Sequence, residues 1–284
     1  MRGALPLSLS ITLLVLLAAL LHAVWNALVK SGADRLSTMA HVTGGGSLAM
    51  APLFFFTPFP SLAMWKVIGL SLVVHLGYKL FLVKSYSHGA LGQVYPLARG
   101  LAPAIVTIVG FTLLGEELSA HATLGIAIII AGILSLAIPR RGEKFNHRGV
   151  FYAMGTSLFI ASYTLNDGLG GRMEQGPNVY AIWLLGLDGV LFWVVALWRR
   201  PAAALLRPSR AMLTGALGGV LSIGAYWIII WAMSISPMGP VATLRETSVV
   251  FAALISGLIL KEGLGWRAVF AALVVMTGIM MLEF

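Results

Sequence analysis

The chain has 284 residues, of which 59% are hydrophobic and only 10% charged, and its mean hydropathy is +0.93. Soluble domains carry about 25% charged residues, so this composition excludes a soluble globular fold and is typical of a protein embedded in a bilayer. The absence of cysteine excludes disulfides and thiolate metal sites, and the net charge of +9 comes from basic residues in short links between apolar runs, not from a nucleic-acid-binding face.

Ten apolar runs are long enough to cross a bilayer as helices, since a crossing needs roughly 20 residues. The first run is long enough to span and contains polar residues, so we expect a span and not a cleaved signal peptide. We predict an all-α integral membrane protein with ten transmembrane helices, joined by short links. The predicted spans are residues 5–29, 38–56, 62–83, 90–114, 120–138, 149–169, 179–198, 211–233, 241–260 and 264–282.

Basic residues outside the spans gather on one side of this topology. The other side holds only Arg2, Lys66 and Arg172. The positive-inside rule places the basic side in the cytoplasm, so we expect a bacterial cytoplasmic (inner) membrane protein with both termini extracytoplasmic. The basic side holds Lys30, Arg35, Lys84, Arg140, Arg141, Lys144, Arg148, Arg199, Arg200, Arg207, Arg210, Lys261 and Arg267.

The chain also repeats itself at a spacing of 146 residues. A unit of five helices crosses the membrane an odd number of times, so its second copy must enter from the other side. Inverted repeats of this kind are common in secondary carriers, although chance similarity between apolar segments is the alternative. We expect residues 1–142 and 143–284 to be two inverted repeats of one transmembrane domain. The matching pairs are Arg99 and Arg245, Glu116 and Glu262, Leu118 and Leu264, and Gly132 and Gly278.

Two helix ends resemble a known family. Leu114-Gly115-Glu116-Glu117-Leu118 and Leu260-Lys261-Glu262, with the glycines that follow, are similar to the EamA branch of the drug/metabolite transporter superfamily. The resemblance covers essentially the whole chain. It implies a carrier with a central cavity between two repeats, alternating access and no use of ATP, for solutes as varied as amino acids, nucleotide sugars and drugs. The sequence LHAVWNALVK at residues 21–30 also resembles a subgroup associated with phosphonate utilisation.

Polar residues inside the spans follow a spacing of three and four residues, which places them on one helix face. Polar groups are costly in hydrocarbon and normally face the bundle interior, so we expect these faces to converge on one space. They are His22, Trp25 and Asn26 in the first span, His75, Tyr78 and Lys79 in the third, and Tyr163, Asn166 and Asp167 in the sixth.

Three further spans add candidates for the same space. Pro96 lacks an amide hydrogen, so a helix break there could line a cavity. The fourth span contributes Tyr95 and Arg99, the eighth Tyr226 and Trp227, and the ninth Arg245 and Glu246.

Each charged candidate has a structural alternative. Arg99 could form a bidentate bond with a carboxylate, phosphate or phosphonate, or pair with Glu246 or Asp188. Arg245 could bind an anion in the same way, or its long side chain could extend to the membrane interface. Lys79 could attract an anion or extend to the cytoplasmic rim. Glu246 could carry a proton or serve as the counter-ion of an arginine.

The uncharged candidates also have two interpretations. His22 and His75 could titrate during transport or bridge helices by hydrogen bonds. Asn26 and Asn166 could line the pocket or bond between helices. The aromatic residues could form a cavity wall or pack in the core, and these are Trp25, Tyr78, Tyr95, Tyr163 and Trp227.

The leading hypothesis is a secondary transporter for a small anionic or zwitterionic metabolite, with the bilayer as its other partner. We predict no catalytic residue, cofactor, metal or nucleic acid, and a homodimer could form. The alternatives are a lipid-headgroup flippase, a channel, or a membrane enzyme, for which no metal or nucleophile motif stands out. Predicted substrate contacts are Arg99, Tyr95, Arg245, Trp25, Asn26, His22, Tyr78, Lys79, Tyr163, Asn166, Tyr226 and Trp227, with Glu246, Asp167 and His75 for proton coupling.

Overall fold

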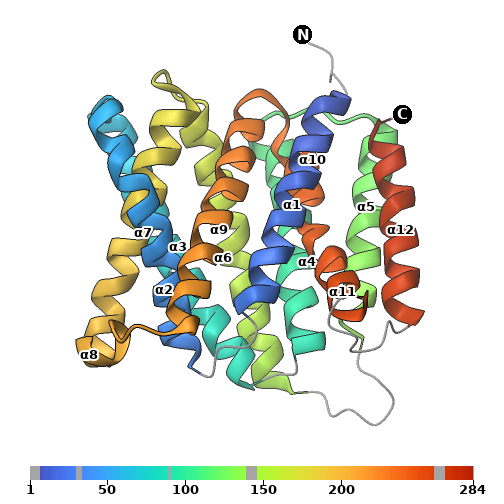
Figure 1. Cartoon of the computed structure of the whole chain (residues 1–284). Helices are drawn as coiled ribbons and strands as arrows, with labels where there is room; N and C mark the ends of the chain where they lie inside the picture. The colour runs from blue at the N-terminus through green and yellow to red at the C-terminus, as the bar shows by residue number, and fades with distance from the viewer. Residues whose placement is uncertain (1–6, 30–33, 89–90, 139–145, 259–265, 284) are drawn as a thin grey trace.

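The computed structural model describes residues 7–29, 34–88, 91–138, 146–258 and 266–283, which form a helical bundle without strands (Figure 1). The α-helices are α1 (Leu9–Val29), α2 (Arg35–Met50), α3 (Leu62–His88), α4 (Leu91–Leu113), α5 (Ala120–Ser135), α6 (His147–Gly171), α7 (Gly176–Arg199), α8 (Ala202–Leu205), α9 (Arg210–Ile235), α10 (Met238–Glu246), α11 (Ser248–Leu258) and α12 (Trp266–Glu283). A 3-10 helix, η1 (Ala51–Phe56), extends α2.

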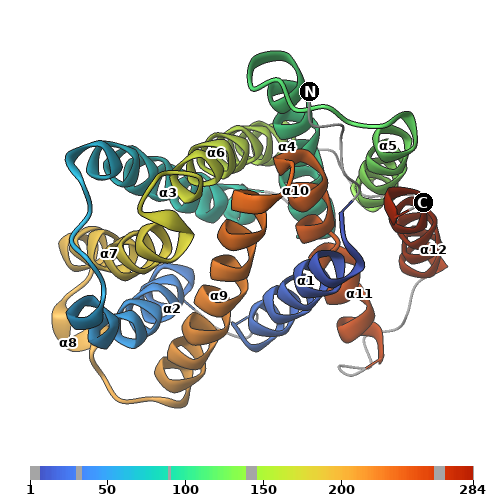
Figure 2. The same cartoon turned by 90° about the horizontal axis from the view of Figure 1, so that it is seen from above.

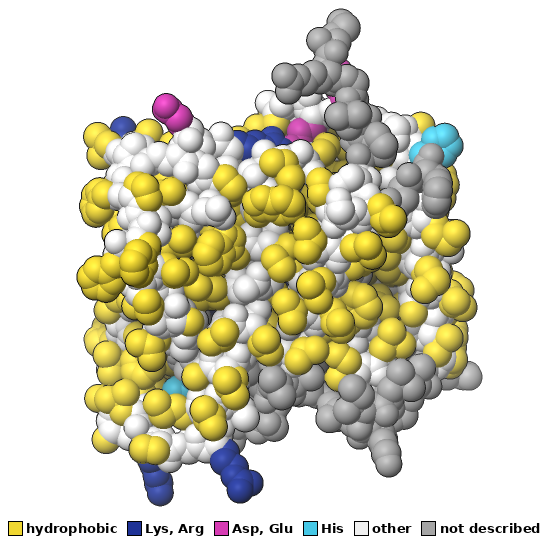
Figure 3. All heavy atoms as spheres, turned by 45° about the horizontal axis from the view of Figure 1, so that its top comes forward, with side chains coloured by type: hydrophobic (Ala, Val, Ile, Leu, Met, Phe, Trp, Pro, Cys, Tyr) yellow, Lys and Arg dark blue, Asp and Glu magenta, His cyan; other side chains and the backbone are white. Residues whose placement is uncertain are grey.

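The described residues confirm the predicted all-α architecture of ten membrane spans. The second span is α2 with η1, the ninth is α10 with α11, and α8 is a short helix that the sequence did not predict. Five segments are individually long and apolar enough to cross a membrane, and three shorter apolar helices accompany them. Large hydrophobic side chains cover the outer face, as a lipid-facing surface requires (Figure 3).

Helix pairing shows the predicted relation between the two halves. Helix α1 packs against α9, and α3 packs against α6, which is the same contact with the halves exchanged. Helices α2 and α7, α4 and α10, and α5 and α12 each pack against their own counterparts (Figure 2). This pattern places a pseudo-twofold axis through the centre of the bundle.

Glycines let α2 approach its neighbours closely, as expected for small residues in helix interfaces. A Cβ atom at Gly219 of α9 would collide with the backbone of Val42 and Gly46 in α2. At Gly189 of α7, it would collide with the backbone of Thr43. The backbone of α2 is therefore held tightly between α7 and α9.

The ninth span is interrupted in the middle of the bundle. Helix α10 ends at Glu246, Thr247 forms a turn in which its backbone N–H donates to Leu244 O at 3.1 Å, and α11 begins at Ser248. The expectation of a break at Pro96 is wrong, because α4 continues through this proline from Leu91 to Leu113. A buried membrane helix tolerates an internal proline when its neighbours compensate for the lost hydrogen bond.

A carboxylate caps the start of α10. Glu116 lies in the link between α4 and α5, and its Oε2 accepts the backbone N–H of Met238 at 2.9 Å. Arg172, at the end of α6, donates to Glu116 Oε1 at 2.8 Å and to the carbonyl of Ser236. Glu116 therefore joins the two repeats at the end of the bundle where α10 begins, and its partner in sequence, Glu262, lies outside the described residues.

Candidate functional site

A cavity of about 100 Å³ lies in the centre of the bundle, between the two repeats. Its walls come from α1, α2, α3 and α4 of the first repeat and α6, α7, α9 and α10 of the second. The expected convergence of polar faces is therefore found in the structure. Nine predicted residues line the cavity: His22, Trp25, His75, Tyr78, Lys79, Arg99, Tyr163, Tyr226 and Arg245.

Two predicted residues are buried behind this wall. Asp167 and Glu246 have no exposed surface, and each is held by side chains that do line the cavity. They act on the cavity through their charge and not by direct contact.

Three other predicted residues do not border the cavity. Asn166 donates to Val67 O of α3 at 2.9 Å, which is the interhelical alternative, and Tyr95 packs against the apolar core. Trp227 donates to Asn178 at 2.9 Å and borders a separate, shallower pocket with Trp231. The side chain of Asn26 lies outside the described part of the structure.

Two arginines and one glutamate form the first charged cluster. Arg99 Nε lies 2.5 Å from Glu246 Oε2, and Arg245 Nη2 lies 2.8 Å from Glu246 Oε1. Arg245 also donates to Thr164 Oγ1 at 3.2 Å, a contact that the sequence did not indicate. Two positive charges share one negative charge, so the cluster carries a net charge of +1.

One donor of this cluster has no partner. Arg245 is only 3% exposed, and its Nη1 makes no hydrogen bond to any described residue. The guanidinium carbon of Arg245 lies 5.7 Å from the ring centres of both Tyr163 and Tyr226, which is cation–π distance. Arg245 therefore keeps one buried donor without a partner among the described residues, which is a costly arrangement for a guanidinium N–H.

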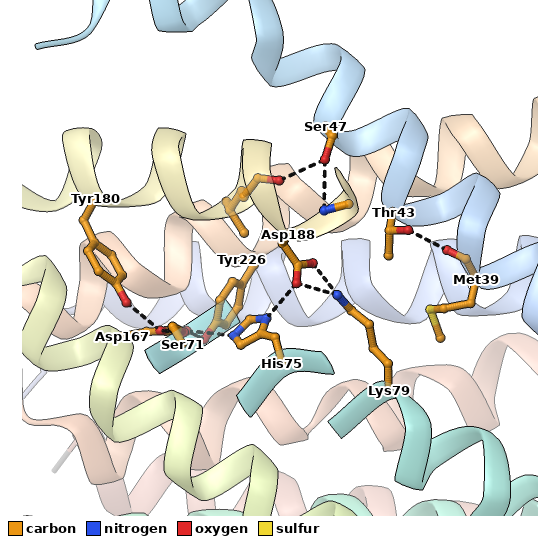
Figure 4. Close-up of polar contacts among 12 residues, drawn as sticks. Met39, Thr43, Ser47, Ser71, His75, Lys79, Asp167, Tyr180, Asp188 and Tyr226 are labelled. Carbon is orange, nitrogen blue, oxygen red and sulfur yellow. Dashed lines mark hydrogen bonds and ion pairs between the residues drawn. The ribbon is translucent and has the colours of Figure 1, made fainter. Parts of the chain in front are cut away.

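The second charged cluster surrounds Asp167 (Figure 4). Its Oδ1 accepts hydrogen bonds from the hydroxyls of Ser71 and, at 2.8 Å, Tyr180. Its Oδ2 accepts from the Tyr226 hydroxyl at 2.5 Å and contacts His75 Nε2 at 3.0 Å. Four polar contacts satisfy both oxygens of an ionised carboxylate. Ser71 and Tyr180 were not predicted, because nothing in their own spans sets them apart.

Asp188 of α7 extends this cluster to the cavity wall. Lys79 Nζ donates to Asp188 Oδ1 at 2.5 Å, and His75 Nδ1 lies 3.7 Å from the same oxygen (Figure 4). Lys79 therefore pairs with a carboxylate and does not extend to the cytoplasmic rim. The sequence analysis offered Arg99 as a possible partner of Asp188, but Arg99 pairs with Glu246, and the partner of Asp188 is Lys79.

The cavity reaches into both halves of the bundle. Its lining residues from α3 and α4, including Lys79 and Arg99, lie in the helix halves next to the link between these two helices. That end also carries Arg199 and Arg200, whereas Glu116 and Arg172 join the repeats at the other end. The lining residues of α3 and α4 thus lie toward the basic end of the molecule, whereas Tyr163 and Ile229 lie in the opposite halves of α6 and α9.

Comparisons with known proteins agree with this architecture. The sequence model of the EamA-like transporter family matches the chain twice, over residues 9–138 and 147–284. Among 28 matching solved chains, one titled "Crystal structure of protein" is 17% identical with a TM-score of 0.77, and the match covers 96% of this chain and 97% of that one. At this identity, the likeness shows the fold alone. No curated protein matches, and the phosphonate-associated subgroup stays a prediction.

Proposed function

The chain belongs to the EamA-like transporter family, and from this premise we propose that it is a secondary transporter for a small anionic or zwitterionic metabolite. The substrate would bind in the central cavity, and the two repeats would expose this cavity to the two sides of the membrane in turn. Inverted-repeat carriers bind their substrates near the bilayer midplane between the repeats, where this cavity lies.

The observation that carries this proposal is the charge of the arginine cluster. Arg99 and Arg245 share the single carboxylate of Glu246 and leave a net charge of +1 beside the cavity. An intramembrane charge of this kind is costly, and it is normally retained for function. A carboxylate, phosphonate or phosphate would neutralise it, and would accept the hydrogen bond that Arg245 Nη1 lacks.

Aromatic side chains would enclose the rest of the substrate. Trp25, Tyr78, Tyr163 and Tyr226 come from both repeats and line the same cavity. Its small volume favours a solute of a few heavy atoms over a large drug. A zwitterion would place its ammonium group toward Asp188, which also lines the cavity.

We further propose that the basic end faces the cytoplasm, in accordance with the positive-inside rule. Both termini would then be extracytoplasmic, because α1 begins and α12 ends at the opposite end of the bundle (Figure 1). The structure would then correspond to an inward-facing state, because side-chain contacts join the repeats at the outer end. The join between Glu116 and Arg172 would close the outer end.

Transport in proteoliposomes tests the proposal. The purified chain would be offered acetate, glycine, methylphosphonate and aminomethylphosphonate, each radiolabelled. We expect saturable uptake of at least one solute, and a loss of that uptake in Arg245→Gln. The matched control is Arg210→Gln, since Arg210 is an exposed residue at the start of α9. Uptake that is equal in both variants would remove the arginine cluster from the mechanism.

A lipid-headgroup flippase is the second candidate, because a shallow pocket between α1, α7 and α9 is lined by Leu14, Trp227 and Trp231. Such a groove could admit a lipid from the side. The same liposomes would reveal this activity as loss of fluorescence from a labelled lipid when a quencher is added outside. Lipid movement without uptake of small solutes would favour the flippase.

A further inference from the structure

His75 lies between two carboxylates. Its Nε2 is 3.0 Å from Asp167 Oδ2, and its Nδ1 is 3.7 Å from Asp188 Oδ1. A neutral imidazole has one N–H group, whereas an imidazolium has two. Because each ring nitrogen faces an acceptor, this position suits the doubly protonated ring.

His22 lines the same cavity, but its ring nitrogens face hydrogen-bond donors, whereas those of His75 face acceptors. Its Nδ1 accepts the indole N–H of Trp25 at 3.2 Å, and its Nε2 lies 3.1 Å from Nη2 of Arg99. Indole and guanidinium groups are donors only, so a second proton on this ring would face a donor. The two cavity histidines, which the sequence could not tell apart, therefore differ in their capacity to take up a proton.

The groups around His75 carry a net charge that a proton on its ring would balance. Asp167 and Asp188 are negative and Lys79 is positive, so this cluster has a net charge of −1 when His75 is neutral. It becomes neutral when His75 binds a proton. The groups that face His75 are Ser71 and Lys79 on α3, Tyr163 and Asp167 on α6, Tyr180 and Asp188 on α7, and Tyr226 on α9, with Arg99 of α4 and Arg245 of α10 on the same cavity.

Two tyrosines connect this cluster to the arginine cluster. Tyr226 donates to Asp167 and has Arg245 over its ring. The ring centres of Tyr163 and His75 lie 4.3 Å apart with the rings tilted by 53°, and the guanidinium carbon of Arg245 lies 5.7 Å from the centre of the Tyr163 ring. The proton position and the proposed anion position are therefore separated by one aromatic ring. Charges this close in a low-dielectric interior influence each other strongly.

We propose that His75 is the binding site of a coupling proton, which moves together with a substrate of net charge −1. This inference rests on the proposed function. With both sites empty, the −1 and +1 clusters sum to zero, and with both filled each cluster is itself neutral. A proton alone or an anion alone leaves a net charge inside the membrane, which is the unfavourable state for a conformational change. The transport step is then one proton with one monoanion, with no net charge moved.

The first test needs no substrate. Histidine labelled with nitrogen-15 in the full chain gives separate NMR signals for imidazolium and neutral imidazole, and His75→Gln identifies the signal of His75. At about pH 7, we expect Asp167→Asn and Asp188→Asn each to lower the ratio of imidazolium to neutral His75 about tenfold or more, because an opposite charge within about 4 Å favours the charged form. Lys79→Gln should raise the ratio of imidazolium to neutral His75.

The exposed His121 provides the internal control, since its ratio should stay constant in all three variants. Two variants of different carboxylates guard against the loss of folding in one of them. An unchanged His75 ratio in both carboxylate variants, or a ring that stays neutral from about pH 5 to pH 9, would overturn the proton site.

The second test separates the proton site from transport itself. Liposomes with a trapped pH dye would receive methylphosphonate or acetate, with the membrane potential clamped by valinomycin and potassium. We expect one-to-one movement of protons with the anion, rates that do not depend on the potential, and no pH-driven accumulation by His75→Gln.

The outcomes of the two tests are distinguishable. Transport of the anion without proton movement would overturn the coupling and leave the proposed function intact. A positive NMR result without transport of any probe would refute the proposed function and leave the proton site standing.

Discussion

Arg99 Nε and Glu246 Oε2 lie 2.5 Å apart, although the two residues belong to opposite repeats. Arg99 is 2% exposed and Glu246 is fully buried, so this ion pair joins α4 to the interrupted end of α10 deep inside the bundle. Glu246 also pairs with Arg245, its neighbour in the chain. If the two repeats move relative to each other, the contact between Arg99 and Glu246 must therefore break and form again, or the two residues must move together.

Replacing Glu246 with glutamine should destabilise the protein, because it leaves two buried guanidinium groups without a counter-charge. Breaking a buried ion pair typically costs about 3–5 kcal/mol. Thermal unfolding in detergent would measure the loss, and an added anion should restore part of it by taking the place of the carboxylate. Glu117→Gln, at an exposed position in the nearby link, should change little. Equal stability of the two variants would show that Glu246 does not hold the arginines.

Arg245→Lys keeps the positive charge but removes the planar guanidinium, whose Nη1 has no partner among the described residues. Nε and Nη2 of Arg245 already donate to Glu246, so Nη1 is the donor that an anion could use, and lysine lacks the rigid fork that holds Glu246 and keeps this further donor in place. We expect the affinity for a transported anion to fall at least about tenfold, or about 1.4 kcal/mol, by isothermal titration calorimetry. The matched change Arg210→Lys should leave binding unaltered. Unaltered binding by Arg245→Lys would mean that charge alone recognises the anion.

Gly219→Leu should weaken the contact between α2 and α9, because any Cβ at this position would collide with the backbone of Val42. Overpacking typically costs about 1–3 kcal/mol, and backbone atoms have little freedom to move aside. Gly224→Leu on the same helix is the control, since no atom lies within 4 Å of a Cβ built there. Both variants carry the same loss of a helical glycine, so thermal unfolding of the pair isolates the steric effect. Similar melting temperatures would contradict the tight packing.

The architecture could largely be predicted from the sequence, since span length and the 146-residue repeat both follow from local pattern. The interruption after Glu246 could not. Pro96 has the sequence signature of a break, yet α4 continues through it. The turn at Thr247 has no proline or glycine, and it depends on contacts made by its own side chain, which donates to Leu244 O at 2.6 Å.

The candidate site, like the fold, could be predicted only in part from local sequence pattern. Spacing along one helix showed that His75, Tyr78 and Lys79 share a face, and all three line the cavity. Spacing cannot show which helix lies opposite that face. The contact between Lys79 and Asp188 joins residues 109 positions apart, and Asn166 bonds to Val67 O of α3 and does not line the cavity. Such partners follow only from the packing of the helices.

The pair of Asp34 and Arg200 at the basic end should make stability depend on pH. Burial acts to raise the pKa of Asp34, but hydrogen bonds from Ser37 and Arg200 hold it below its ordinary value of 3.8. A carboxyl group whose pKa is lowered by folding stabilises the protein above the pKa of the unfolded chain, and this contribution is lost as the pH falls through the folded value. Thermal unfolding should show Asp34→Asn less stable than wild type at about pH 7.

The difference between Asp34→Asn and wild type should narrow below about pH 3.8 and disappear at lower pH. The effect should be modest, because both side chains are nearly half exposed and salt screens such pairs. Asparagine keeps the oxygen that accepts the Leu36 N–H at the start of α2, so a constant difference at all pH values would show that the charge of Asp34 does not contribute.

Accessibility of the cavity from each side of the membrane tests the central claim most directly. The chain contains no cysteine, so Ser222→Cys on the cavity wall introduces a single thiol without background. In oriented vesicles, an impermeant maleimide should label it from the basic side alone. Adding Arg172→Gln, which removes the join to Glu116 at the other end, should shift labelling toward that other side. Equal labelling from both sides in the parent, or none from the second side in the double variant, would contradict alternating access.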